Sequence, residues 1–202
     1  MVGVVHVPFG ATSGAARGMG RKLTSLYPVA TRWLTSADRA ALYRHFTSLE
    51  MTARRSRFGS ALTDDAIAAY VRHVDFGRVS AIAVSDLLIG EIVGVAEAHL
   101  DELGRARRAE IAVSLLSPWR RIGLGTALAR QAVAHAFSAG ASRADFHFPP
   151  DSRAISAVVR ALRGRVDAVR GYGWIDRETC EILRFPPIRL VRTDRRSAAW
   201  SD

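Results

Sequence analysis

Residues 117–126, Ser-Pro-Trp-Arg-Arg-Ile-Gly-Leu-Gly-Thr, combine two arginines with two glycines between an apolar run and a helical pattern. Gly123 and Gly125 carry no Cβ, so a ligand can approach their backbone closely and turn conformations barred to other residues are open. The first N–H groups of a helix lack internal partners and lie at the positive end of its dipole. A strand, a glycine-containing turn and a helix N-terminus in this order predict a phosphate-binding site.

Two well-known phosphate-binding motifs do not match this turn. A Walker P-loop ends in Gly-Lys-Ser/Thr, whereas residues 123–126 read Gly-Leu-Gly-Thr and contain no lysine, which excludes that motif. The dinucleotide-binding fingerprint G-x-G-x-x-G follows the first strand of a βαβ unit. Here the third glycine is missing and several expected strands come earlier in the chain, so the fingerprint fits poorly.

The composition is that of one ordinary globular domain. The chain has 202 residues, of which 49% are hydrophobic and 24% charged. No apolar run approaches the roughly 18 residues needed to cross a bilayer. The single cysteine, Cys180, excludes an internal disulfide and a cysteine-rich zinc site, which suits a reducing, cytoplasmic location. No two histidines stand at metal-ligand spacing, so no metal site is expected.

The formal net charge of +10 favours an anionic ligand without identifying it. Lys22 is the only lysine, and such one-sided use of arginine resembles coding bias more than a DNA-binding surface. Nucleic acid is therefore not expected as a partner. Binding through the arginines of residues 153–170 and the C-terminal tail remains an alternative, which predicts steeply salt-dependent affinity.

Hydrophobic periodicity predicts the elements that position the turn. Strands are expected at residues 29–34, 80–84, 92–99, 109–116 and 143–148, with a last pair at 166–169 and 179–185 around a Gly-Tyr-Gly-Trp turn at 171–174. Helices are expected at residues 37–49, 63–74, 126–139 and 152–162, and residues 51–59 are expected to form a basic connection.

This order describes an α+β fold, an α/β/α sandwich with a mixed, mostly antiparallel sheet and helices on both faces. The strands at 80–84 and 92–99, joined by a turn that contains Gly90, should form an antiparallel hairpin. Residues 1–26 contain no Asp or Glu and are expected to be a flexible leader, residues 27–185 the folded domain, and residues 186–202 a basic tail.

The segment Arg120-Arg-Ile-Gly-Leu-Gly125 resembles the R/Q-x-x-G-x-G/A coenzyme A loop of the GCN5-related N-acetyltransferase (GNAT) family. The resemblance extends to Ala109-Glu-Ile-Ala-Val113 before the loop and to Asp151-Ser-Arg-Ala-Ile155 after it. It covers about residues 30–185, and its pattern is most similar to bacterial members that acetylate protein lysines. It implies the acyl-CoA N-acyltransferase fold and acetyl-CoA as cofactor.

The family's fold separates the two strands that flank the loop and its following helix, and pantetheine enters the gap between them. By resemblance, Leu115 and Leu116 would pair with the pantetheine amides, and Ser152 would cap a helix or contact the cofactor. Backbone groups of the turn would hold the pyrophosphate, with added charge from one of the arginines: Arg120, Arg121, Ile122, Gly123, Leu124, Gly125 and Thr126. A solvated loop is the alternative interpretation of these arginines.

Glu110 is the candidate general base, because acetyl transfer needs the acceptor amine to be neutral. Burial inside an apolar strand would raise its pKa toward neutrality, and the residue matches the glutamate of the lysine-acetylating members. The alternative is an exposed residue paired with Arg107 or Arg108. Glu97 on the preceding strand is the second choice.

Many members of the family use a tyrosine as general acid where this chain has Val158 and Val159. Tyr172 is a candidate general acid in place of this tyrosine, although no sequence pattern supports it. Water is the other candidate source of the proton. We therefore expect an N-acetyltransferase that acts on a protein lysine or a small amine in a ternary complex, as a monomer or homodimer. The alternative is a non-catalytic acyl-CoA-binding sensor of the same fold.

Overall fold

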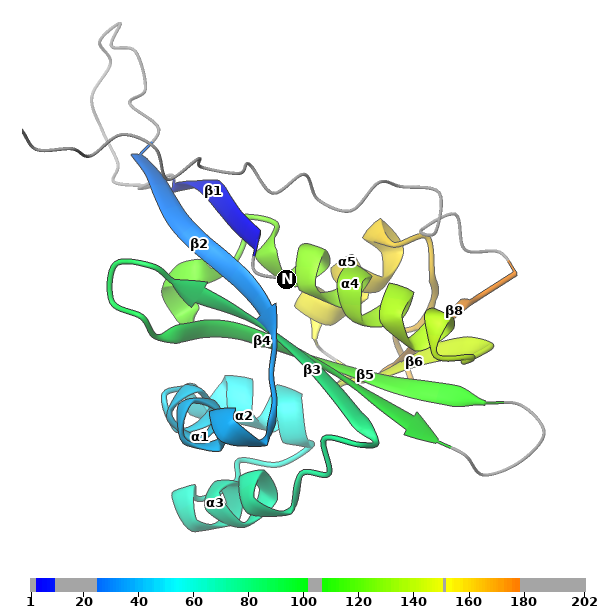
Figure 1. The fold of residues 1–202 in the computed structure, drawn as a ribbon. Helices are drawn as coiled ribbons and strands as arrows, with labels where there is room; N and C mark the ends of the chain where they lie inside the picture. The colour runs from blue at the N-terminus through cyan, green and yellow to red at the C-terminus, as the bar shows by residue number, and fades with distance from the viewer. Residues whose placement is uncertain (1–2, 10–24, 102–106, 151, 179–202) are drawn as a thin grey trace, which may run out of the picture.

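The computed structural model describes residues 3–9, 25–101, 107–150 and 152–178. At its centre lies an eight-stranded sheet with the order β1-β2-β3-β4-β5-β6-β8-β7 (Figure 1). The strands are β1 Gly3–Phe9, β2 Ser25–Trp33, β3 Val79–Asp86, β4 Ile92–Asp101, β5 Arg108–Leu115, β6 Arg143–His147, β7 Arg165–Asp167 and β8 Tyr172–Asp176.

Helices cover both faces of the sheet, as the sequence predicted (Figure 1). One face carries α1 Arg39–Thr47, α2 Met51–Phe58 and α3 Asp64–His73, and the other carries α4 Leu124–Ser138 and α5 Arg153–Ala161. Only β5 and β6 run parallel among the described neighbours. The mixed, mostly antiparallel α/β/α sandwich and the hairpin of β3 and β4 are therefore confirmed.

Each helical layer has its own hydrophobic core. Phe46 of α1 and Ile67 of α3 are fully buried over the β3–β4 part of the sheet. On the other face, Leu128 of α4 packs into a second cluster with Ile111 of β5. Helix α3 begins as predicted, because the Thr63 hydroxyl accepts a hydrogen bond of 3.3 Å from the Ala66 N–H.

Strands β5 and β6 separate soon after they meet. β5 pairs with β4 over its whole length, from Arg108 to Leu115. It pairs with β6 only at its first three positions, and the last of these joins Glu110 to Asp145. Beyond Glu110, the edge of β5 that faces β6 has no strand partner in the described part of the chain, so a gap opens between the two strands.

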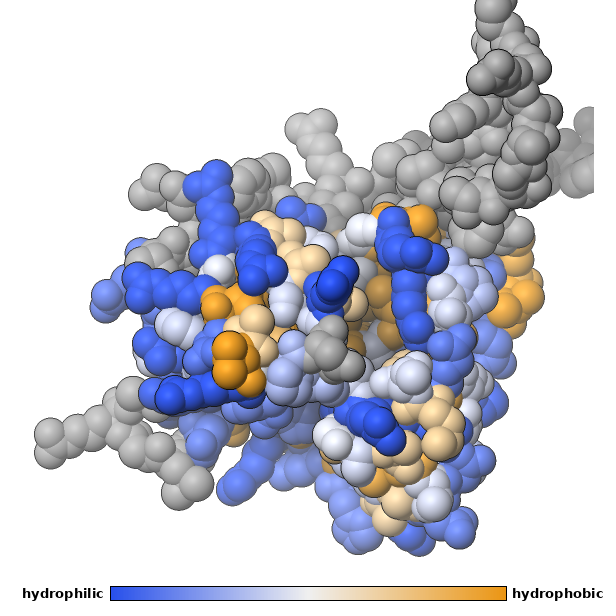
Figure 2. All heavy atoms as spheres, turned by 180° about the vertical axis from the view of Figure 1, so that it is seen from behind, coloured by the Kyte–Doolittle hydropathy of each residue, from blue (hydrophilic) through white to orange (hydrophobic). Residues whose placement is uncertain are grey.

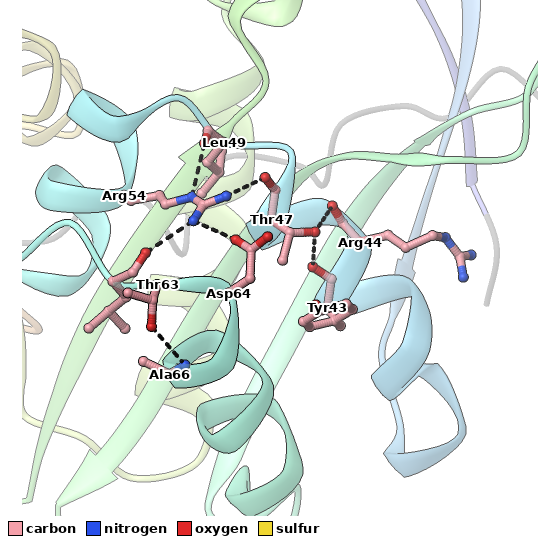
Figure 3. Close-up of polar contacts among 9 residues, drawn as sticks. Tyr43, Arg44, Thr47, Leu49, Arg54, Thr63, Asp64 and Ala66 are labelled. Carbon is pink, nitrogen blue, oxygen red and sulfur yellow. Dashed lines mark hydrogen bonds and ion pairs between the residues drawn. The ribbon is translucent and has the colours of Figure 1, made fainter.

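The segment expected as a basic connection at 51–59 is instead the helix α2, so that prediction is wrong. Arg54 holds the helix in place through its guanidinium, which donates to the carbonyls of Leu49 at 3.1 Å and Leu62 at 3.0 Å and pairs with Asp64 at 2.7 Å (Figure 3). Periodicity missed α2 because the largely buried Arg54 and Arg57 share its inner face with Ala53 and Phe58. Gly59, with φ of +75°, ends the helix.

The end of the described chain also differs from prediction. Only Gly171 of the predicted Gly-Tyr-Gly-Trp turn lies in a turn, and the other three residues belong to strand β8, which pairs with β6 and β7. A Cβ on Gly173 would lie 3.1 Å from the side chain of Val159, so this glycine reflects close packing of α5 on the strand. The strand expected at 179–185 and the basic tail at 186–202 lie outside the described residues.

The expected flexible leader contains a strand. Residues 3–9 form β1, which pairs antiparallel with β2, so the prediction is wrong for those residues, while residues 10–24 lie outside the described part.

No helix among the described residues combines the length and apolar character of a membrane span. Viewed from behind, apolar residues form separate patches among hydrophilic ones (Figure 2).

Candidate active site

The turn between β5 and α4 has the backbone expected of an anion-binding site. Gly123, with φ of +88°, is the N-cap of α4, and no side chain caps the helix. The first intrahelical bond joins the Ala127 N–H to the Gly123 carbonyl at 3.0 Å. The N–H groups of residues 124–126 therefore have no intrahelical partner at the positive end of the dipole. A Cβ on Gly123 would meet no atom within 4 Å, so this side of the turn is open.

Leu115 sits between the glycines that let α4 approach the sheet. A Cβ on Gly94 of β4 would lie 2.4 Å from Leu115 Cδ2, and one on Gly125 of α4 would lie 3.2 Å from Leu115 Cδ1. Both contacts are closer than ordinary van der Waals packing allows. Gly125 therefore serves the close approach of helix and strand, which brings the N-terminus of α4 to the end of β5.

Several backbone groups expected to meet pantetheine already have partners. The Leu116 N–H donates to the Val93 carbonyl at 2.9 Å, and the Leu116 carbonyl accepts from the Trp119 N–H at 2.9 Å. The Leu115 carbonyl accepts from Arg120 Nε at 3.0 Å. An amide of the cofactor would have to share these groups or use the open edge earlier in β5.

The two arginines of the turn differ in their surroundings. Arg120 is half-buried and lies 3.5 Å from Glu50 Oε2, while its Nη2 atom is buried without a hydrogen-bond partner in the described structure. Arg121 is exposed and has φ of +63°, an uncommon value for a residue with a side chain. Arg120 therefore ties the turn to β5, and Arg121 is the arginine free to meet an anion from solvent.

The start of α5 provides the other wall of the gap. Ser152 is the N-cap of α5, but its side chain makes no capping hydrogen bond, contrary to the expectation that it could cap the helix. Val158 is half-buried and lies 3.9 Å from the position of a Cβ on Gly125. Val159 is fully buried. The place where relatives carry a tyrosine is therefore apolar in this chain.

Glu110 is exposed rather than buried, so the burial expected from its apolar strand is wrong. Its side chain is 56% exposed, and its Oε1 atom lies 3.4 Å from Nδ1 of His147 on β6. The exposure that the alternative interpretation expected is observed, but no pairing of Glu110 with Arg107 or Arg108 is seen among the described residues, and Arg108 instead lies 3.9 Å from Asp145. Glu110 lines a small hollow at the mouth of the gap with Ser56, Arg57, Ile111, Ala112, Val113, His147 and Ile155.

Glu97 is the buried carboxylate of this face. It is fully buried and forms an ion pair with Arg57 of α2, and the Tyr70 hydroxyl donates to both of its oxygens at 3.2 Å. The Arg57 guanidinium lies 4.7 Å from the centre of the Phe58 ring. Arg57 thus compensates the charge of the Glu97 carboxylate, which is also enclosed. Glu97, the second choice of base, therefore does not suit that role. In the sequence, the arginines within residues 54–57, close to aromatic residues, could have indicated this network.

A row of polar side chains crosses the sheet at the level of Glu110. His99 of β4 and Asp145 of β6 are its register partners on either side. Burial lowers the pKa of His99 to about 4, with the charge of Arg57 acting in the same direction and that of Glu110 opposing it. The Tyr172 hydroxyl donates to Asp145, and burial together with this hydrogen bond raises the pKa of Tyr172. His99 is therefore neutral at pH 7 and Tyr172 keeps its proton.

A strand that leaves its parallel neighbour and is followed by a helix with an uncapped N-terminus is the arrangement that the resemblance to the GNAT family implies. The model of the acetyltransferase (GNAT) family matches residues 24–158. The chain belongs to this family. Comparison with curated proteins found no match.

Solved structures share this fold at low sequence identity. The GNAT domain of S. lividans PAT has a TM-score of 0.59 at 16% identity, with 74% of this chain and 90% of that chain covered. Ribosomal-protein-S5-alanine acetyltransferase from Vibrio fischeri has a TM-score of 0.58 at 12% identity, with coverage of 75% and 94%. A Salmonella typhimurium protein solved with its cofactor acetyl-CoA has a TM-score of 0.55 at 14% identity, with coverage of 73% and 93%.

Proposed function

We propose that this protein is an N-acetyltransferase that moves the acetyl group of acetyl-CoA to a primary amine by direct attack in a ternary complex. The observation that supports it most is the gap between β5 and β6. The uncapped N-terminus of α4 follows one end of this gap, and Glu110 stands at the other end. The proposed acceptor is a small-molecule amine or a protein lysine.

The residues of the turn suit the pyrophosphate of coenzyme A. The N–H groups of residues 124–126 are uncapped, Gly123 leaves space for a phosphate, and Arg121 offers an exposed guanidinium. The half-buried side chains of Leu115, Ile122 and Val158 offer apolar contact to the rest of the cofactor. Leu116, Thr126 and Ser152 are further residues that we propose to contact the cofactor. The bound cofactor would supply an activated acyl thioester.

Glu110 is the proposed general base. Its exposed carboxylate can meet an incoming ammonium group at the mouth of the gap, with His147 beside it. Glu110 would take one proton from the ammonium group, and the neutral nitrogen would then bond to the thioester carbonyl carbon. The second nitrogen proton would pass to water as the C–S bond breaks, and the electron pair of that bond would leave with the sulfur. The acceptor would gain an amide bond, and the first proton would pass from the carboxylate to solvent.

Water is the proposed proton source for the departing thiolate. Val158 and Val159 have no proton to give, and the Tyr172 hydroxyl is engaged with Asp145. The lack of a side-chain proton donor at residues 158 and 159 also favours a second candidate function. This function is an acyl-CoA sensor that binds the cofactor without transferring the acyl group.

A pair of measurements separates the two functions. Acetyl-CoA affinity is measured by calorimetry, and thiol release is followed with a thiol reagent across a panel of small amines and lysine-containing peptides. Amine-dependent thiol release with matching amide product supports the transferase. Tight binding without thiol release for any acceptor would instead establish the sensor.

A further inference from the structure

A groove of about 630 Å³ lies between α3 and the strands β3 and β4, on the face of the sheet that carries Glu110. It is separate from the coenzyme A turn, and it shares Tyr70 and His99 with the polar groups described above. Its volume is within the range of small-molecule sites, which is roughly 300–1,000 Å³. Six apolar residues make up most of its lining, although the Leu100 side chain packs on the other face of the sheet: Leu62, Ala66, Ala69, Val74, Val79 and Leu100.

One residue of the groove is the cross-strand neighbour of the proposed base. His99 lines the groove and is the direct cross-strand partner of Glu110. Directly opposite residues of an antiparallel pair share a face, with Cβ atoms roughly 5 Å apart. Tyr70 also lines the groove, and its hydroxyl donates to Glu97 and accepts from Arg57. Arg57 in turn lines the hollow around Glu110. A molecule that contacts His99 in the groove therefore lies one cross-strand position from Glu110.

The charges around the groove cancel. At its rim, Asp75 Oδ2 lies 3.9 Å from Arg78 Nε, and both side chains are largely exposed. At its inner end, the Glu97 carboxylate is compensated by Arg57. His73 stands at the rim with Nδ1 bound to the Ala69 carbonyl at 2.7 Å. No uncompensated carboxylate faces the groove from the described residues, and the net charge of +10 repels polycations from the whole surface.

We propose that this groove holds the body of the acceptor, and that the acceptor is a primary amine carried on an uncharged, apolar body such as an alkyl chain or an aromatic ring. The inference rests on the proposed acetyl transfer. The apolar lining binds the body, and the amine reaches past His99 to Glu110. Polyamines and other acceptors with a second cationic group are poor substrates, because the groove has no anion to pair with the second charge.

The first test compares n-hexylamine with 1,5-diaminopentane, which match in length but differ in one ammonium group. With saturating acetyl-CoA, we expect kcat/KM for n-hexylamine to be at least tenfold higher. The second test fills the groove with Ala69→Trp and uses Ala68→Trp as matched control, because Ala68 is on the same helix but does not line the groove. Ala69→Trp should raise KM for n-hexylamine at least tenfold and leave acetyl-CoA affinity unchanged, whereas Ala68→Trp should change neither value.

Binding of n-hexylamine to the coenzyme A-loaded protein is measured in parallel by calorimetry, and thermal melts confirm that each variant is folded. Equal kcat/KM values for the two amines, or an unchanged KM for n-hexylamine in Ala69→Trp, would overturn the groove assignment. The proposed transferase function would not be affected by either result. Binding of n-hexylamine that Ala69→Trp abolishes, without thiol release from any amine, would instead overturn the transferase function and with it the acceptor role of the groove.

Discussion

Glu110 of β5 stands opposite Asp145 of β6 at the last position where the two strands pair. Each carboxylate has its own neighbour, since Glu110 lies near His147 while Asp145 accepts from the Tyr172 hydroxyl. One carboxylate is therefore exposed at the mouth of the gap and the other is buried beneath it. This arrangement leaves Glu110 as the carboxylate of the pair that solvent can reach.

Glu110→Gln should lower kcat at neutral pH by about 10²-fold or more, because the amide cannot accept the amine proton. Acetyl-CoA affinity should be unchanged, since Glu110 lies away from the α4 N-terminus. Steady-state kinetics at saturating acceptor together with calorimetry measure both effects. Glu91→Gln is the matched control, because Glu91 pairs with Arg44 at 3.3 Å at an exposed site. An unchanged kcat in Glu110→Gln would assign the base to another group.

Gly123→Asp should weaken acetyl-CoA binding at least tenfold, because a carboxylate at the N-cap would repel the pyrophosphate. The strain of a side chain at φ of +88° adds to the effect on stability. Gly59→Asp is a close control, because Gly59 has φ of +75° and a Cβ there also meets no atom within 4 Å. Both variants should lose stability, and only Gly123→Asp should lose affinity in calorimetry. Equal affinities would refute the position of the pyrophosphate.

Arg57→Met should lower the free energy of unfolding by about 3–5 kcal/mol, because it leaves the Glu97 carboxylate buried without a cation. Glu97 is fully buried and the Arg57 side chain is 8% exposed, so solvent screens the pair little. The double variant Arg57→Met/Glu97→Leu should recover part of this loss. Urea denaturation of the single and double variants measures it, and additive losses would show that the two residues do not act as a pair.

The stability of the protein should fall as the pH falls from 7 to 4, in part because of His45. Burial lowers the pKa of His45 to about 4, while a backbone hydrogen bond to Ile92 opposes the shift and the charge of Arg57 adds to it. Below the unfolded pKa of about 6.5, the unfolded chain binds a proton that folded His45 does not bind. The contribution of His45 is therefore complete at pH 7 and declines by about 3 kcal/mol by pH 4.

His45→Gln should flatten this pH dependence. The His45 ring donates from Nδ1 to the Ile92 carbonyl at 3.1 Å and accepts at Nε2 from the Ser114 hydroxyl at 2.8 Å. Loss of these bonds should make the variant less stable at pH 7, and the difference from the parent should shrink toward pH 4. Urea denaturation at several pH values provides the measurement. A constant difference across this range would mean that His45 does not titrate with the expected shift.

The features predicted best depend on residues close together in the chain. Gly123 and the uncapped start of α4 could be read from the sequence, because positive φ and helix N-terminal N–H groups are local properties. The cap of α3 at Thr63 was predicted for the same reason. The alternating and helical apolar patterns also predicted most strands and helices and the two-faced sheet.

Tertiary structure alone decided which polar groups are buried. Glu97 and Glu110 lie on adjacent strands and on the same face of the sheet, yet one is fully buried and the other 56% exposed. Their local sequences cannot distinguish them, because coverage of this face comes from α2, which lies about forty residues earlier in the chain and brings Arg57 to Glu97. The sequence by itself determined the glycine turn at the start of α4 and the family fold. Packing between distant segments determined the carboxylate that remains open to solvent.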